Sequence, residues 1–292
     1  MISSTDRATM PRLTDLLRPA ADASVFSNHG RGFAGSVDRT VVLLVTLAGL
    51  ACPYGPVLWY KSMLLAFAAV GGLVLLGAGA ATVFATRRGE RIQGPRRRAA
   101  LIGRSAGDTA LAAWIAACFA AWPMARADAG EPIGLVWSLA EAGGLSAVVW
   151  QTLLGVLVLD AWLYWKHRLL HTRLLFPFHR GHHVYRDPTP FAGFAVGPVE
   201  SVMTFWPILL VAFPWATHFG PTYVALVVGF VLLNYYLHCG VTFRALEATL
   251  PRLFVNTSAF HNRHHANAEV NFGEALTLWD HICRTRAEDR RR

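Results

Sequence analysis

The chain has 292 residues, of which 54% are hydrophobic and only 15% are charged. Because an ordinary soluble domain carries about 25% charged residues, this composition argues against a soluble globular protein. Basic residues outnumber acidic ones by 27 to 18, but nearly all are arginines clustered near apolar runs, which favours membrane topology over nucleic-acid binding as the reason for the net charge of +9.

The N-terminal part is expected to be a polar arm followed by membrane spans. Residues 1–38 carry several charges and show no signal-peptide pattern, so we expect a flexible or surface-lying arm. Residues 39–142 are expected to hold spans around an arginine-rich loop. The uncharged run 62–86 is long enough to cross a hydrocarbon core of about 30 Å. The uncharged run 40–60 contains two prolines that should bend or end its helix early.

Four further apolar runs follow. Residues 109–124 form a short, marginal span, whereas 143–165 is long enough to cross. The runs 201–217 and 223–237 are joined by a turn and form either two spans or a hairpin that enters from one side. The sequence therefore predicts an all-α, polytopic membrane helix bundle of about four to six spans.

Arginine placement predicts the orientation of the bundle. Seven arginines lie within 87–108 and five within 284–292, and arginine-rich loops stay in the cytoplasm. The arginine-poor connections near residue 61 and at 125–142 should then lie outside. With six crossings, both termini and the histidine motifs described next fall on the cytoplasmic side. The high alanine, glycine and arginine content favours a bacterial source and hence an inner membrane.

Eight of the twelve histidines fall in three motifs, HRLLH at 167–171, HRGHH at 179–183 and HNRHH at 261–265. Residues three or four apart share one helix face, so each motif should direct two or three imidazoles to one point. Imidazole suits zinc, copper, iron and nickel, and three motifs hold more nitrogen than one metal takes. We therefore predict two metals that share the ligands His167, His171, His179, His182, His183, His261, His264 and His265.

Three other residues are candidates for the same site. His238 ends an apolar run and is expected to be a ninth ligand, the alternative being a neutral histidine bonded to a carbonyl. Asn234, one turn earlier, is expected to reach a metal directly or through water. Asp160 shares a helix stripe with His167 and is expected to accept the second ring N–H of a ligand, the alternative being a helix-end aspartate exposed at the interface. Three histidines are expected to lie outside the metal set: His29, His218 and His281.

The ligand types point to chemistry on a lipid. Two irons with open positions could bind and activate O2, and the chain lacks the Glu-x-x-His pairs of carboxylate-bridged di-iron bundles. Because the motifs follow apolar spans directly, the metals should sit at the membrane boundary, where a lipid can keep its headgroup in water. Cleavage of a C–H bond there needs the reacting carbon held close and water kept out.

The motifs, in this order, resemble those of the fatty acid hydroxylase and sterol desaturase superfamily. The similarity extends to DAWLYWKHRLLH, HRGHHVYRDPTPFAG, LNYYLH and NFGEALTLWDHICRT, and so covers about residues 155–286. It implies a hydroxylase-like catalytic domain at 143–286, whose histidine motifs lie in a cytosolic helical cap, followed by a basic tail at 287–292. It further implies a non-haem di-iron enzyme that uses O2 and two electrons to hydroxylate or desaturate a lipid. The electrons would come from a separate cytochrome b5-like or ferredoxin-type protein.

Two positions depart from the family pattern. Gly197 stands where many relatives have a histidine, which weakens assignment to a sterol subfamily, and His281 stands where relatives usually have arginine or lysine. Two other classes of protein were weighed. A metal transporter or sensor would place its ligands at mid-membrane on broken helices. A metallohydrolase would need a glutamate base beside its histidines, as in HExxH, and none of the motifs has one.

Overall fold

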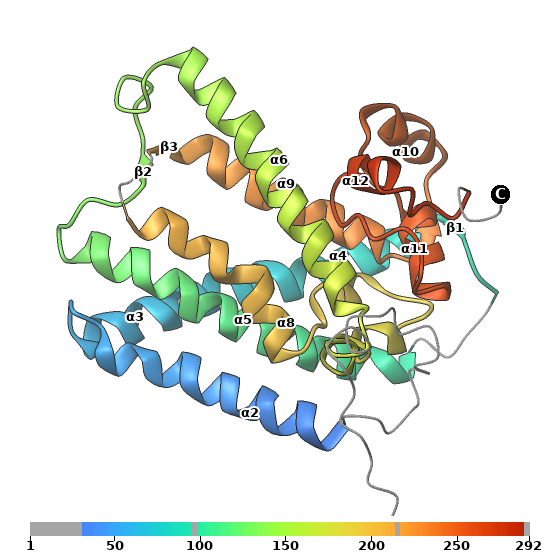
Figure 1. The fold of residues 1–292 in the computed structure, drawn as a ribbon, viewed down its shortest axis with the longest axis horizontal. Helices are drawn as coiled ribbons and strands as arrows, with labels where there is room; N and C mark the ends of the chain where they lie inside the picture. The colour runs from blue at the N-terminus through green and yellow to red at the C-terminus, as the bar shows by residue number, and fades with distance from the viewer. Residues whose placement is uncertain (1–30, 95–98, 214–216, 289–292) are drawn as a thin grey trace, which may run out of the picture.

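The computed structural model describes residues 31–94, 99–213 and 217–288. Within this part of the chain, five helical segments are long and apolar enough to cross a membrane, which confirms the predicted all-α membrane bundle (Figure 1). They are Gly32–Ala51, Pro56–Arg88, Leu101–Asp128, Leu145–Leu170 and Gly220–Leu237. His29 and most of the predicted arm lie outside the described residues, as does most of the basic tail.

The spans of the N-terminal half begin and end at residues that the sequence explains. The elements are α2 (Arg31–Leu47), η1 (Ala48–Ala51), α3 (Pro56–Ala66), the π-helix η2 (Phe67–Gly71), α4 (Gly72–Arg88) and α5 (Ala99–Asp128). As expected, the first helix ends before the two prolines. Pro56 then opens α3 at a helix position where its missing N–H costs nothing.

One boundary differs from the prediction. Helix α2 begins at Arg31 and the first span at Gly32, so residues 32–38 belong to that span and not to a polar arm. Asp38 made this segment look polar, but its carboxylate accepts a hydrogen bond from the Val199 backbone N–H at 3.1 Å. That contact ties α2 to the start of a later helix and gives a charged residue a partner inside an apolar segment.

The C-terminal half is built from one long helix, one further span and several short turns of helix. Its elements are α6 (Leu145–Leu170), α7 (Phe176–His179), η3 (His182–Val184), η4 (Pro190–Phe194), α8 (Pro198–Phe205), η5 (Trp206–Ala212), α9 (Gly220–Leu237), α10 (Arg244–Thr249), η6 (Leu250–Leu253), α11 (Ser258–Ala266) and α12 (Leu278–Ile282). Apart from α8 and η5, the short elements gather at one end of the bundle, beyond the ends of α6 and α9 (Figure 1).

Two small sheets mark the two ends of the bundle. At one end β1 (Glu90–Arg91) pairs antiparallel with β4 (Val241–Thr242), which follows α9 closely. At the other, β2 (Leu135–Val136) pairs in parallel with β3 (His218–Phe219), in register Leu135↔His218 (Figure 1). The connection 125–142, which was predicted to lie outside, therefore meets the turn at His218 at one end of the bundle.

The loop that follows α4 lies at the same end as the histidine motifs. Arg91 forms an ion pair with Asp187 at 2.9 Å, just after the second motif. Gln93 donates a hydrogen bond to Asn262, inside the third motif, at 2.8 Å. The arginine-rich loop and the histidines thus share one end of the bundle, as the sequence predicted from charge and spacing separately.

The apolar segment Pro198–Val211 is shorter than the five spans, yet it runs from one end of the bundle to the other. At its start, Glu200 contacts the second histidine motif. Near its end, the Val211 carbonyl accepts a hydrogen bond from the Gly134 N–H at 2.9 Å, beside β2. The hairpin that the sequence allowed is therefore replaced by two passages, the first of which is partly 3-10 helix and so rises further per residue.

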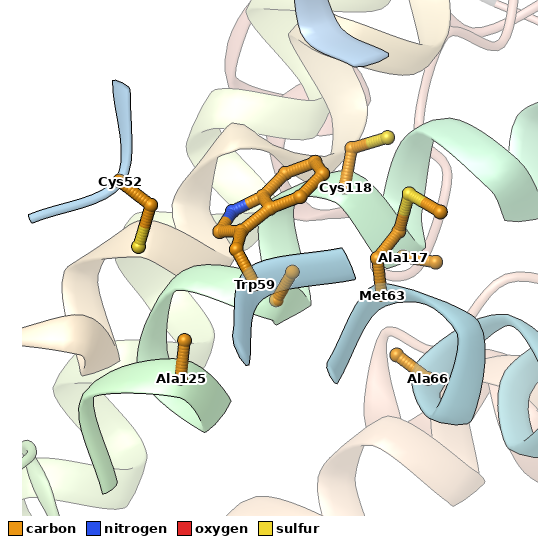
Figure 2. Packing of buried hydrophobic residues seen from close by; sticks show 8 residues of the cluster. Cys52, Trp59, Met63, Ala66, Ala117, Cys118 and Ala125 are labelled. Carbon is orange, nitrogen blue, oxygen red and sulfur yellow. The ribbon is translucent and has the colours of Figure 1, made fainter. Parts of the chain in front are cut away.

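The N-terminal spans pack around a tryptophan. Trp59 on α3 is fully buried against small residues of α5, with Cys52 and Met63 beside it (Figure 2). The buried alanines of α5 let the neighbouring helices approach closely, as small residues do between membrane helices. Half of an apolar 18-residue stretch of α5 is buried, whereas only 11% of such a stretch of α6 is buried. The first span is also 11% buried, so it and α6 are the two least buried of the five, although α6 carries the first histidine motif.

Candidate metal centre

The three histidine motifs and His238 lie in four separate segments that meet at one end of the bundle. His167 lies in the last turn of α6, and His171 caps its C-terminus. The second motif occupies α7 and η3, and the third occupies α11, whose N-terminus is capped by the Thr257 hydroxyl, which accepts from Phe260 N–H. His238 caps the C-terminus of α9. The histidines therefore gather at the end of the bundle where α6 and α9 finish.

All nine predicted ligands fall into two compact groups of buried histidines. One group contains His167, His171, His179, His183 and His264. The other contains His182, His238, His261 and His265. Within each group, the potential ligand atoms all lie within 4.8 Å of one another. His218 and His281 belong to neither group, as expected.

The structure corrects the expected direction of the imidazoles within each HxxHH motif. We expected each HxxHH motif to direct its imidazoles to one point, but both motifs are divided between the groups. His179 and His183 face the group of five, whereas His182 faces the group of four. On a helix, residues four apart differ by only about 40° in direction, whereas adjacent residues differ by about 100°. Two neighbouring histidines therefore belong to different groups.

The spacing of the ring nitrogens fits metal ligands. In the group of five, His183 Nε2 lies 3.2 Å from His171 Nε2 and 3.0 Å from His179 Nε2. In the group of four, His238 Nε2 lies 3.0 Å from His261 Nε2 and 3.4 Å from His182 Nε2. Nitrogens about 2.1 Å from one metal stand about 3.0 Å apart in octahedral geometry and about 3.4 Å apart in tetrahedral geometry.

Hydrogen bonds on the other ring nitrogen orient four of the imidazoles. The contacts of Nδ1 are His167 to Phe272 O at 2.8 Å, His264 to Val270 O at 2.7 Å, His238 to Asn234 O at 3.0 Å and His179 to Glu200 Oε2 at 2.7 Å. A ring that donates from Nδ1 keeps its Nε2 lone pair for a metal. The Nε2 atoms of His167 and His264 are buried and have no hydrogen-bond partner, so a metal would satisfy them.

Burial also keeps the ligands in the form that metals bind. It lowers the pKa of His238 and of His264 to about 4. Burial is likewise the largest cause that lowers the pKa of His183 and of His265, and the neighbouring imidazoles lower it further. The side chains are therefore neutral near pH 7, with lone pairs free for metal binding.

The two supporting residues predicted from the sequence take different places. Asp160 makes no hydrogen bond to His167, because seven helical residues separate them by about 10 Å along the axis. Its Oδ1 accepts from the Leu276 N–H at 2.8 Å and so holds the loop that carries Phe272. The Asn234 side chain lines the space next to the histidines, and its Oδ1 is buried without a hydrogen-bond partner.

Sequence reasoning missed three charged residues beside the histidines. Glu200 is buried, and its Oε2 lies 2.7 Å from His179 Nδ1. Lys166 is 2% exposed and pairs with Glu274 at 2.8 Å. Glu200 is the sole charge in the apolar run 191–213. The rule that ionisable residues inside apolar runs are functional, which pointed to Asp160, would have pointed to Glu200 as well.

A cavity adjoins both groups of histidines, between α6, α8 and α9. One wall is polar and includes Lys166, Glu200 and Glu274. The other wall is apolar and contains Phe194, Phe205, Phe230 and Leu237. The lining therefore combines ionisable and apolar side chains beside the histidines.

Comparison with known proteins finds similarity over part of the chain. The family model "Fatty acid hydroxylase" matches residues 152–285. Lathosterol oxidase from Rattus norvegicus is 38% identical over 127 residues, covering 42% of this chain and 40% of the relative. The Delta(7)-sterol 5(6)-desaturase ERG3A of Gibberella zeae is 33% identical over 151 residues, covering 51% of this chain and 41% of the relative.

These matches span less than half the length of the curated relatives. No solved structure matches this chain. The matched region nevertheless contains all nine histidines and the charged residues beside them. Residues 152–285 are therefore similar to the fatty acid hydroxylase family.

Proposed function

We propose that this protein is a di-iron enzyme that uses O2 to hydroxylate or desaturate an unactivated C–H bond of a membrane lipid. The observation that carries the proposal is the pair of buried histidine groups, whose nitrogens are spaced as metal ligands are. The printed names of the relatives describe sterol oxidation and desaturation, which supports a lipid substrate.

The residues fit two metals that share one site. One iron would be held by the group of five histidines and the other by the group of four. Two irons with O2 and two electrons would supply the oxidant that removes hydrogen from a saturated carbon. Around them, the chain excludes water by burying the ligands and fixes the rings through Glu200 and backbone carbonyls. The cavity wall of α8 and α9 would hold the lipid body beside the ligands.

The proposed location is a cell membrane, with the histidine end of the bundle in the cytoplasm. Support comes from the arginine-rich loop, which joins the histidine motifs through Arg91 and Gln93. A bacterial inner membrane fits the composition. The electron donor would be a cytochrome b5-like or ferredoxin-type protein that docks at the cytoplasmic end. A metal transporter is less well supported, because both histidine groups lie at one end of the bundle and not at mid-membrane.

The metal assignment is tested by iron content. We expect the purified chain to hold about two irons, one for each histidine group. His182→Ala and His264→Ala, one from each group, should abolish both iron binding and turnover. His218→Ala and His281→Ala serve as controls and should leave iron content unchanged. Full iron occupancy in both ligand variants would show that the site is assigned wrongly.

The reaction is tested by following lipids. With a reductase system supplied, we expect O2-dependent consumption of a membrane lipid and a product that is either hydroxylated or desaturated. A comparison of lipids from cells with and without the gene should identify both the lipid that is consumed and the product that is formed. Identical lipid profiles, in cells that make iron-loaded protein, would contradict the proposal.

A further inference from the structure

A buried ion pair stands at the polar wall of the cavity, beside the histidines. Lys166 Nζ lies 2.8 Å from Glu274 Oε1 and donates a hydrogen bond to Thr204 Oγ1 at 3.0 Å. The Lys166 and Glu274 side chains are 2% and 15% exposed, and both line the cavity together with Thr204. This group of three residues, the Lys166 triad, joins α6, α8 and the loop before α12.

Neither metal binding nor folding accounts for this pair. His167 already bonds Phe272 O through Nδ1, and Glu274 Oε1 is 3.8 Å from that nitrogen. Removing two charges from water is costly, and a buried ion pair can often be replaced by apolar residues without loss of stability. The chain has only two lysines, and one of them is placed here. The cost of burying it points to a role in binding.

We propose that the Lys166 triad binds an uncharged hydroxyl group of the lipid substrate. The inference rests on the proposed function in that the ligand occupies the same cavity. An ammonium group has three N–H donors, and two of those of Lys166 are directed to Glu274 and Thr204. A lipid hydroxyl can accept the third and donate its own hydrogen to the Glu274 carboxylate. The apolar body then lies along the wall that contains Phe205 and Phe230.

The charges of the cavity favour a neutral hydroxyl over an anionic headgroup. Glu274 already balances the charge of Lys166, and Glu200 adds a second acid to the same wall. A phosphate, sulfate or carboxylate would meet no surplus of positive charge there. A hydroxyl group both donates and accepts, so it can join the pair without separating it.

The position of the triad also places the reacting carbon. Because Glu274 is 3.8 Å from a ring nitrogen of His167, a hydroxyl bound there lies near the ligand cluster. The carbons closest to the oxidant are then those near the hydroxyl-bearing end of the lipid. Oxidation should occur there and not at the far end of the apolar body.

The experiment measures binding without turnover. The full chain is purified in detergent and kept without reductant, and lipid pairs are added at equal concentration. Native mass spectrometry then counts which lipid is bound. One series compares 5α-cholestan-3β-ol with 5α-cholestane and with the 3-sulfate ester. The second compares 1-hexadecanol with hexadecane and with hexadecyl sulfate.

We expect the alcohol to be preferred over its hydrocarbon by about 10- to 100-fold in at least one series, as a hydrogen bond to a charged group allows. The double variant Lys166→Met/Glu274→Met removes both charges together and should bind alcohol and hydrocarbon equally. The exposed pair Lys61–Asp128, at 2.9 Å, provides the matched control, and Lys61→Met/Asp128→Met should keep the preference.

Three results would overturn the inference. They are no preference for either alcohol in the wild-type chain, a preference for a sulfate ester, and a preference that persists in the Lys166/Glu274 variant. If that variant does not fold, Thr204→Val replaces it and should reduce the preference. If the chain binds no iron, the proposed function fails, but the alcohol preference is still measured, because this assay needs no turnover.

Discussion

The contact between His179 and Glu200 is the shortest link between a predicted ligand and an acid outside the motifs. Both side chains are buried, and Oε2 lies 2.7 Å from Nδ1. A carboxylate that accepts from Nδ1–H fixes the ring and makes Nε2 a better metal ligand. Glu200→Gln keeps the size of the side chain but weakens this contact. Its affinity for iron should therefore fall about 10- to 100-fold.

The measurement is competition for iron between the protein and a chelator of known affinity. Glu141→Gln provides a control, because Glu141 is exposed and lies at the opposite end of α6. An unchanged iron affinity in Glu200→Gln would mean that Glu200 does not support the ligand.

The nine histidines could be predicted because helix spacing decides which side chains point the same way, and all nine do meet. The hydrogen-bond partners of their second ring nitrogens could not be predicted from the sequence. Phe272 and Glu200 reach His167 and His179 through tertiary packing, from 105 and 21 residues away in sequence. The prediction for Asp160 used the direction of its side chain but not its distance along the helix.

Among the elements, the loop between α11 and α12 fixes the orientation of two histidine rings. Its Phe272 and Val270 carbonyls accept from His167 and His264. Asp280, at the start of α12, fixes this loop. It accepts from the N–H groups of Phe272 and Gly273 at 2.9 and 2.7 Å, and from the Thr285 hydroxyl at 2.6 Å.

Asp280→Ala should therefore act at a distance on the metal centre. Loss of three hydrogen bonds to a buried carboxylate should reduce the unfolding free energy by about 3 kcal/mol or more, and iron affinity should fall with it. Unfolding is followed by tryptophan fluorescence in detergent, and iron by metal analysis. Asp128→Ala, at an exposed ion pair, should change neither. A folded Asp280→Ala protein with full iron affinity would contradict this role of the loop.

The packing of η1 against α3 depends on a glycine. A Cβ on Gly49 would lie 2.1 Å from Cε3 of the Trp59 ring, which is fully buried. Gly49→Ala should thus destabilise the protein by about 1–3 kcal/mol through overpacking. Gly72→Ala is the matched control, because no atom lies within 4 Å of its Cβ. It should raise stability by about 0.5–1 kcal/mol. Equal melting temperatures for the two variants would contradict the close approach.

Element boundaries could be predicted where proline sets them, as at Pro56, and less well where a tertiary contact does. Asp38 suggested a polar arm until its contact with Val199 explained why it can lie in a span. The sequence left open whether the run 201–217 crosses or forms half of a hairpin, because it does not reveal the stretch of 3-10 helix within Pro198–Val211. Helix type within an apolar run depends on its neighbours.

At the scale of the whole molecule, the two small sheets define two ends of different character. The β1–β4 end holds the arginine-rich loop and all nine histidines. The β2–β3 end holds the arginine-poor connections. Because arginine-rich loops stay in the cytoplasm, the first end should face the cytoplasm and the second the opposite side. An enzyme oriented in this way would receive its electrons from the cytoplasm.

This orientation is tested with single cysteines. Cys283 is replaced by serine, since the other three cysteines are buried. A cysteine is then placed at Glu90, in β1, or at Glu131, just before β2, where both native residues are exposed. An impermeant maleimide added to cells whose outer side is accessible should label Glu131→Cys at once. It should label Glu90→Cys only after the membrane is opened. The reverse pattern would place the histidines outside, and labelling of both before opening would mean that the two sheets lie on one side of the membrane.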